Sequence, residues 1–169
     1  IARKHDLFLL SDEVYREFCY TDEPHFSAMQ IPGLEQNVIL IDSVSKRYNL
    51  CGARIGCIIS HNKDVIAAAM KFAQARLCPP VLGQMASIGA LDTPDEYFDA
   101  VKEEYIKRRD FMIEGLNKIE GVFTPLPMGA FYTIAELPVD DTENFAKWML
   151  ENFRVDNETT MVTPAASFY

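Results

Sequence analysis

The 169-residue chain has little histidine, no paired cysteine motif and no long hydrophobic run. Its three histidines are scattered, and no two of its four cysteines form a Cys-x-x-Cys pair, so a zinc site has no support. Four cysteines in a chain of this length do not resemble the disulfide framework of a small secreted protein, so we expect free thiols. No apolar run approaches the roughly 18 residues that a membrane span needs.

Positive charge is also scarce. Lys and Arg number 16 against 25 Asp and Glu, which gives a formal net charge of −9. Nucleic acids and anionic membranes bind basic faces, so we expect neither as a partner. No secretory signal pattern of charge, apolar stretch and small residues is present, and we expect a cytoplasmic protein. Apolar residues make up 49%, which is enough for a folded core.

Both ends of the sequence lie close to strand-like stretches. The first residue is Ile1, and an apolar run follows almost at once at residues 7–10. The last two residues, Phe168 and Tyr169, come soon after a strand-like stretch that begins near residue 160. We therefore expect an internal fragment of a longer protein.

Three short apolar runs in the first part of the chain predict buried strands. They lie at residues 7–10, 37–42 and 54–60, and polar residues follow the first two. Continuous apolar strands are typical of a sheet covered on both faces, which indicates an α/β layer. Residues 21–33 contain two prolines and several polar residues, so we expect a loop there.

Caps, periodicity and helix breakers predict the remaining elements. We expect helices at residues 62–76, 83–91, 93–119 and 142–153, and strands at 130–137 and from residue 160. The predicted fold is the C-terminal part of a mostly parallel doubly wound sheet with an antiparallel third strand, then a long connecting helix and a small α+β domain. Residues 1–92 would belong to the first domain and residues 93–169 to the long helix and an incomplete second domain.

Three polar clusters lie at the ends of the predicted strands, at residues 11–15, 42–46 and 52–56. Ligands of open α/β sheets bind outside the carboxyl ends of the strands. If the third strand runs antiparallel, its start lies at the same edge. One carboxylate, one phenol, two hydroxyls, one amine and one guanidinium would then meet there.

This set of groups suits an anionic cofactor with a reactive aldehyde. A lysine amine forms Schiff bases with carbonyl groups. Arginine together with serine binds phosphate through a planar donor fork and a neutral donor. A buried aspartate suits a protonated ring nitrogen. These are the requirements of pyridoxal 5'-phosphate.

The motifs resemble those of the class I and II aminotransferases, in the fold-type I pyridoxal-phosphate superfamily. Ser-Val-Ser-Lys at 43–46, followed by Gly-Ala-Arg-Ile-Gly at 52–56, is similar to the family's lysine signature, with Lys46 and Arg54 eight residues apart. Asp-Glu-Val-Tyr at 12–15 resembles the family's Asp-x-x-Tyr element. Cys-Pro-Pro at 78–80 and Pro-Met-Gly-Ala-Phe-Tyr at 127–132 are similar to further family stretches. The resemblance covers essentially the whole chain.

The resemblance implies a role for each position. Lys46 would hold the cofactor covalently and then move the proton between the substrate Cα and the cofactor. Asp12 would pair with the pyridine nitrogen and keep it protonated, and Tyr15 would hydrogen-bond the ring oxygen. The cofactor phosphate would lie near Ser43, Ser45 and Arg54. The substrates would be an amino acid and a 2-oxo acid, and the full-length protein would be a homodimer.

Parts of the family pattern are outside this chain. The arginine that binds the substrate carboxylate follows a Pro-x-x-x-Phe stretch, which matches residues 164–168, and the chain ends one residue later. The family's phosphate loop, ring-stacking aromatic residue and asparagine precede the region covered here. We therefore expect the fragment alone to be inactive.

Other interpretations stay open. The same scaffold carries carbon–sulfur lyases and decarboxylases, and a non-catalytic regulatory domain could be built on it. Ser43-x-x-Lys46 also matches the motif of penicillin-binding proteins, although the Lys-Thr-Gly element is missing. Asp12 could be only a helix cap or a turn former. We expect Phe131 and Tyr132 to pack in the core and Tyr48 to have a packing role instead of a catalytic one, and Arg76 receives no role.

Overall fold

The computed structural model describes residues 1–166, which form two compact units. The first unit comprises residues 1–106 together with residues 128–131. The second comprises residues 107–127 together with the described residues from 132 onward. The long helix α5 (Asp95–Leu116) contributes residues to both.

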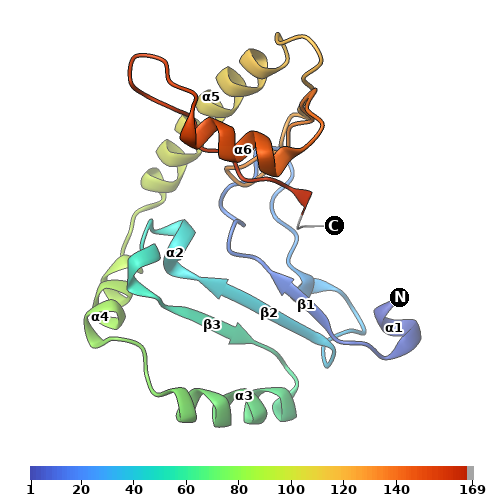
Figure 1. Cartoon of the computed structure of the whole chain (residues 1–169). Helices are drawn as coiled ribbons and strands as arrows, with labels where there is room; N and C mark the ends of the chain where they lie inside the picture. Colours follow the sequence, from blue (N-terminus) through green and yellow to red (C-terminus); the bar gives the residue numbers. More distant parts are fainter. Residues whose placement is uncertain (167–169) are drawn as a thin grey trace. The chain divides into compact units, whose positions relative to one another are not determined.

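The first unit is built on a three-stranded sheet (Figure 1). Its strands are β1 (Leu9–Asp12), β2 (Val38–Ser43) and β3 (Gly56–Ile59), in the order β1-β2-β3. β1 is parallel to β2, and β3 is antiparallel to β2. All three predicted strands exist, although β1 begins two residues later than expected. The reason is the short helix α1 (Ala2–His5). The backbone N–H of Leu7 still donates a hydrogen bond to the carbonyl oxygen of Ala2 in this helix, so the strand begins only after it.

Burial is concentrated on the central strand. Val38 and Leu40 on β2 are buried, and Val38 packs with Ala28 and Leu34 in a small apolar core. The expectation that every strand is buried on both faces is wrong for this chain, since Leu10 on β1 is 64% exposed and both isoleucines of β3 are exposed. β1 and β3 are the two edges of the sheet within the described residues, so each pairs on one side only.

Short helical turns flank the strands, and longer helices follow them. The turns are η1 (Ala28–Gln30), α2 (Val44–Arg47) and η2 (Cys51–Ala53). The helices α3 (Lys63–Arg76) and α4 (Val81–Ala90) confirm the two predicted there. Asn62 caps α3 as expected, because its side chain accepts hydrogen bonds from the backbone of Asp64 and Val65.

The second unit contains the last part of α5 and the helix α6 (Thr142–Glu151), which is capped by Asp141. Thr124 is buried, and the Asn117 side chain bonds both its N–H and its carbonyl oxygen. The strands predicted at 130–137 and from residue 160 are absent from the described part of the chain. Ala130 has a left-handed φ of 59°, which prevents an extended start, and Glu136 makes only an isolated bridge with Phe123.

The four cysteines are unpaired thiols. Within residues 1–166, no helix combines the length and the apolar character that crossing a membrane requires. The same part of the chain holds no group of three or more His, Cys, Asp or Glu side chains placed to bind a metal ion.

Candidate active site

The sheet brings the three polar segments to one edge (Figure 1). β1 ends at Asp12 and β2 ends at Ser43, and parallel strands have their carboxyl ends at the same edge. β3 runs the other way, with Gly56 opposite Ser43, so Arg54 lies just before the start of a strand at that edge. The predicted antiparallel third strand is confirmed, so all three polar segments lie at this edge of the sheet.

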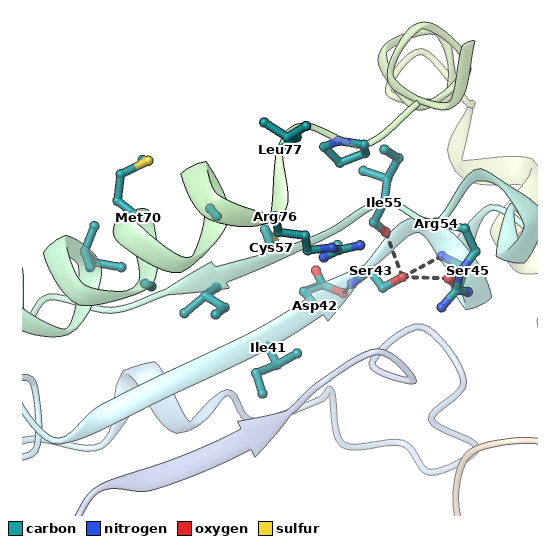
Figure 2. A pocket seen from close by; sticks show the side chains of 16 residues that line it. Ile41, Asp42, Ser43, Ser45, Arg54, Ile55, Cys57, Met70, Arg76 and Leu77 are labelled. Carbon is teal, nitrogen blue, oxygen red and sulfur yellow. Dashed lines mark hydrogen bonds between the residues drawn. The ribbon is translucent and has the colours of Figure 1, made fainter. Parts of the chain in front are cut away.

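Ser43 starts the turn that carries the lysine. Its Oγ accepts a hydrogen bond from the backbone N–H of Ser45 at 3.0 Å and so caps α2. The same hydroxyl lies 2.7 Å from Ser45 Oγ and 2.9 Å from the carbonyl oxygen of Ile55 (Figure 2). The two serines are therefore fixed against each other and against the segment that enters β3.

A pocket with a volume of about 570 Å³ opens beside these serines (Figure 2). Three predicted phosphate ligands, Ser43, Ser45 and Arg54, line it. Apolar side chains from β3 and α3 form most of the remaining wall, and Arg76 at the end of α3 adds a second guanidinium. The pocket thus offers two hydroxyls and two cations to an anionic ligand, and the carboxylate of Asp42 also lines it.

Arg54 adopts a strained backbone conformation. Its φ of 56° and ψ of 38° lie in the left-handed region, at the end of η2. Its Nη1 donates to the carbonyl oxygen of Cys51 at 3.0 Å, and the side chain is exposed. Non-glycine residues in this conformation cost free energy and cluster at functional sites.

Lys46 lies beside two aromatic rings. Its Nζ is 5.7 Å from the centre of the Tyr15 ring and 5.5 Å from that of Phe131. The two rings meet edge to face, with their centres 5.0 Å apart. Both distances lie within the range of cation–π attraction, so the rings weakly attract the amine between α2 and the segment after β1.

Phe131 corrects one expectation from the sequence. We expected Phe131 and Tyr132 to be core residues, but 39% of Phe131 and 63% of Tyr132 are exposed, and the ring of Phe131 contacts Lys46. The reason is backbone pairing between residues 128–130 and 18–20: Gly129 bridges Cys19, and Ala130 donates to the carbonyl oxygen of Phe18 at 2.9 Å. A Cβ on Gly129 would lie only 3.0 Å from that same oxygen. In the sequence, the order Gly-Ala-Phe at 129–131 was the signal that could have indicated this position for Phe131.

Asp12 ends β1 and forms a turn. Its Oδ1 accepts a hydrogen bond from the backbone N–H of Val14 at 3.2 Å. The turn-forming role that the sequence left open is therefore present, and it places Tyr15 on the same short segment. The cofactor role of Asp12 stays a prediction.

The neighbouring Glu13 is buried and accepts several hydrogen bonds. Ser11, Ser27 and the backbone of Ala28 donate to Oε1, and His25 Nε2 lies 2.9 Å from Oε2. Burial alone would raise the pKa of this carboxyl, but the bonds from His25, Ala28 and the two serines outweigh it, so the pKa lies below its ordinary value. Glu13 thus ties the loop at 21–33 to the end of β1.

The six predicted site residues fall into three groups. Ser43, Ser45 and Arg54 share the pocket, Lys46 and Tyr15 are in contact, and Asp12 ends the adjacent strand. Tyr48 packs edge to face on Phe98, in line with the expected packing role. The stretch at 164–168 is described only as far as residue 166, because residues 167 and 168 lie outside the described part.

The sequence matches a known family and several of its members. The family described as Aminotransferase class I and II matches residues 1–163. The aspartate aminotransferase of Rhizobium meliloti is 33% identical over 136 residues, which are 80% of this chain and 33% of that protein. That of Musicola paradisiaca is 30% identical over 172 residues, which cover 99% of this chain and 42% of that protein. The chain spans less than half the length of these relatives.

Solved structures show the same fold. The aspartate aminotransferase of Rhizobium meliloti superposes with a TM-score of 0.76 at 29% identity, covering 88% of this chain and 41% of that one. N-succinyldiaminopimelate aminotransferase from Mycobacterium tuberculosis gives a TM-score of 0.80 at 26% identity, covering 89% and 40%. With the family match over nearly the whole sequence, these likenesses establish that the chain belongs to the class I and II aminotransferase family.

Proposed function

We propose that the full-length protein is a pyridoxal-phosphate-dependent aminotransferase that moves an amino group between an amino acid and a 2-oxo acid. The observation that carries this proposal is the position of Lys46. Its amine lies against Tyr15 and Phe131, on the turn that begins at the pocket serine Ser43. The family membership supplies the reaction class.

The residues present fit the cofactor. Its phosphate is a dianion, which suits the paired hydroxyls of Ser43 and Ser45 and the guanidinium of Arg54 in one pocket. Its aldehyde needs a primary amine, which Lys46 would supply; Lys46 follows Ser45 on α2 but does not itself line the pocket. The donor set therefore contains a group for the anionic end and a group for the electrophilic end of the molecule.

Each proposed residue has a separate task. The bound cofactor supplies an electron-withdrawing ring that stabilises negative charge at the substrate Cα. Lys46 would attach the cofactor and afterwards move the proton at that carbon. Asp12 would keep a proton on the ring nitrogen, and Tyr15 would donate a hydrogen bond to the ring oxygen. Such interactions accelerate the reaction only where they strengthen in the transition state.

The finer organisation is part of the same proposal. Residues 1–92 would be the C-terminal part of a doubly wound cofactor-binding domain, and residues 93–169 the long helix and the beginning of a small domain. The full-length protein would be a cytoplasmic homodimer that binds neither nucleic acid nor membranes.

The names of the relatives suggest which amino donor to test first. Several are aspartate aminotransferases, and one is an LL-diaminopimelate aminotransferase. We therefore propose aspartate with 2-oxoglutarate as the first pair. Formation of oxaloacetate and glutamate would support transamination. Release of carbon dioxide from aspartate without formation of glutamate would support the decarboxylase alternative, and release of a thiol and ammonia from a sulfur-containing amino acid would support the carbon–sulfur lyase alternative.

The attachment site gives the sharpest test. Borohydride reduction of the cofactor-loaded full-length protein, followed by peptide mapping, should place the pyridoxyl group on Lys46. Lys63 and Lys71 on α3 serve as internal controls in the same digest. Label on either of them, with Lys46 unmodified, would refute the assignment.

A further inference from the structure

Next to the proposed site, four charged side chains form a closed cycle of ion pairs, and one of them, Asp42, also lines the pocket. Arg47 Nη2 donates to Asp42 Oδ2 at 2.7 Å, and its Nε lies 2.8 Å from Glu17 Oε1. Arg16 closes the cycle, since its Nε donates to Glu17 Oε1 at 3.0 Å and its Nη1 lies 3.4 Å from Asp42 Oδ2. Each residue contacts two of opposite sign, and the cycle has no net charge.

The cycle is partly withdrawn from water. The side chains of Asp42 and Arg47 are 9% and 13% exposed. Those of Glu17 and Arg16 are more exposed, at 23% and 36%. Burial alone would lower the pKa of the Arg47 guanidinium. The negative charges of Glu17 and Asp42 outweigh this effect, so the pKa lies above its ordinary value and the residue keeps its charge. Charges held this far from water need their partners, because an unmatched one is costly.

The members of the cycle are chain neighbours of the proposed site residues. Arg16 follows Tyr15, Arg47 follows Lys46, and Asp42 precedes Ser43. Arg16 and Glu17 stand on the turn after β1, where the N–H of Arg16 bonds the carbonyl oxygen of Glu13. Arg47 is the last residue of α2, and Asp42 lies near the end of β2. The cycle therefore fastens the Tyr15 segment to the Lys46 segment.

We propose that Arg47 is a positioning residue that, through Glu17 and Asp42, fixes the distance between Tyr15 and Lys46. This inference rests on the proposed function, because the distance matters only if both residues act on one cofactor. The two segments also meet where Lys46 Nζ lies 5.7 Å from the centre of the Tyr15 ring, a contact that orients the side chains only weakly.

The shape of arginine suits this task. Arg47 Nη2 donates to Asp42, and its Nε lies 2.8 Å from Glu17 Oε1 as an ion-pair contact without hydrogen-bond geometry, so one planar guanidinium lies against both carboxylates. A lysine has a single ammonium and can hold only one of the two in the same way. Arg47→Lys should therefore keep the charge and lose part of the positioning.

The test uses the full-length protein loaded with pyridoxal phosphate. For Arg47→Met we expect kcat to fall by about tenfold or more while KM changes less than kcat, as when an interaction is lost chiefly in the transition state. The midpoint of the pH titration of the lysine-bound cofactor's absorbance should move by about half a unit or more. Arg47→Lys should lie between Arg47→Met and wild type in both measurements.

Two further variants keep the test decisive. Glu17→Gln removes one acceptor from the more open side of the cycle, so it should fold even if Arg47→Met does not, and it should shift the titration in the same direction. Arg154→Met is the matched control, because it removes a guanidinium that bonds carbonyl oxygens at the end of α6 in the other unit. It should lower the melting temperature and leave the titration midpoint and kcat unchanged.

The outcomes separate the two proposals. If Arg47→Met and Glu17→Gln lower the melting temperature but leave the titration midpoint and kcat at the wild-type values, the cycle is only structural and this inference is refuted. If wild-type protein forms no lysine-bound absorbance band, the proposed function fails, and the positioning role fails with it.

Discussion

Replacing Glu13 with glutamine should lower the free energy of unfolding of the first unit by about 2–4 kcal/mol near neutral pH. The substitution keeps the shape of the side chain and removes its charge. Glu13 is 3% exposed, so water cannot replace the contacts that weaken. The loss should therefore appear at full size in the stability of the protein.

The magnitude follows from the bonds that the carboxylate accepts. Oε1 receives bonds from Ser11, Ser27 and Ala28 at 3.1, 3.0 and 2.8 Å. A neutral amide oxygen can keep these three, but each falls from about 1.5–3 kcal/mol to about 0.5–1.5 kcal/mol. The amide nitrogen would replace Oε2 opposite His25, where the present distance is 2.9 Å. Shared acceptors are not additive, so the total stays near the stated range.

The effect should depend on pH with a definite sign. Because the pKa of Glu13 is lower in the folded protein than in the unfolded chain, its ionised form contributes stability fully above the unfolded-state pKa. That contribution disappears as the pH falls through the folded-state pKa. Urea unfolding followed by far-UV circular dichroism, at about pH 7 and about pH 3.5, should show a large difference between wild type and Glu13→Gln that shrinks at the lower pH.

Glu35→Gln is the matched control. Glu35 lies beyond the same loop, is exposed, and accepts one backbone bond from Gly33 at 3.0 Å. Its urea midpoint should stay close to that of wild type. An equal stability deficit for Glu13→Gln at both pH values, or no deficit at either, would contradict the role assigned to the buried carboxylate.

Three further predictions concern backbone packing, capping and the ring beside the lysine. Gly83→Ala should lower the unfolding free energy by about 1–3 kcal/mol, because the new Cβ would lie 2.5 Å from the Ala53 carbonyl oxygen. Gly89→Ala, which has open space in the same helix, should be neutral or stabilising, and a similar effect of the two substitutions in urea unfolding would contradict this reasoning. Ser43→Ala should cost about 1 kcal/mol through loss of the α2 cap and should weaken binding of pyridoxal phosphate in an absorbance titration, whereas unchanged affinity would argue against the pocket assignment. Phe131→Leu should raise the rate at which Lys46 reacts with an amine-specific reagent, measured by peptide mapping, because the cation–π contact with the ring is lost. Phe131→Tyr keeps an aromatic ring and should react at the wild-type rate. Equal rates in all three proteins would show that the ring does not restrain the amine.

Local sequence signals predicted most of the first unit. The helix α3 follows from its Asn62 cap and alanine-rich run, and the three strands follow from short apolar runs. These signals act between residues close together in the chain, where helix capping and short apolar runs are decisive. The antiparallel direction of β3 also proved correct, and it places Arg54 beside the serines.

The features missed by the sequence depend on distant contacts or single backbone angles. Nothing local indicates that Arg16 and Arg47 share two carboxylates, because these residues meet only when β1 and β2 pair. The expected strand at 130–137 fails because Ala130 turns left-handed, while the same turn brings Phe131 to Lys46. From the sequence alone, an apolar residue in such a stretch can equally be a core residue or a residue that lines a binding site.

The left-handed backbone of Arg54 sets stability and function against each other. A non-glycine residue at φ 56° carries a conformational cost of about 1–2 kcal/mol that glycine would avoid. Selection for thermal stability alone would therefore favour glycine here and would delete a guanidinium from the pocket wall. A library screened only for heat resistance should accumulate variants that fold better and bind anions worse.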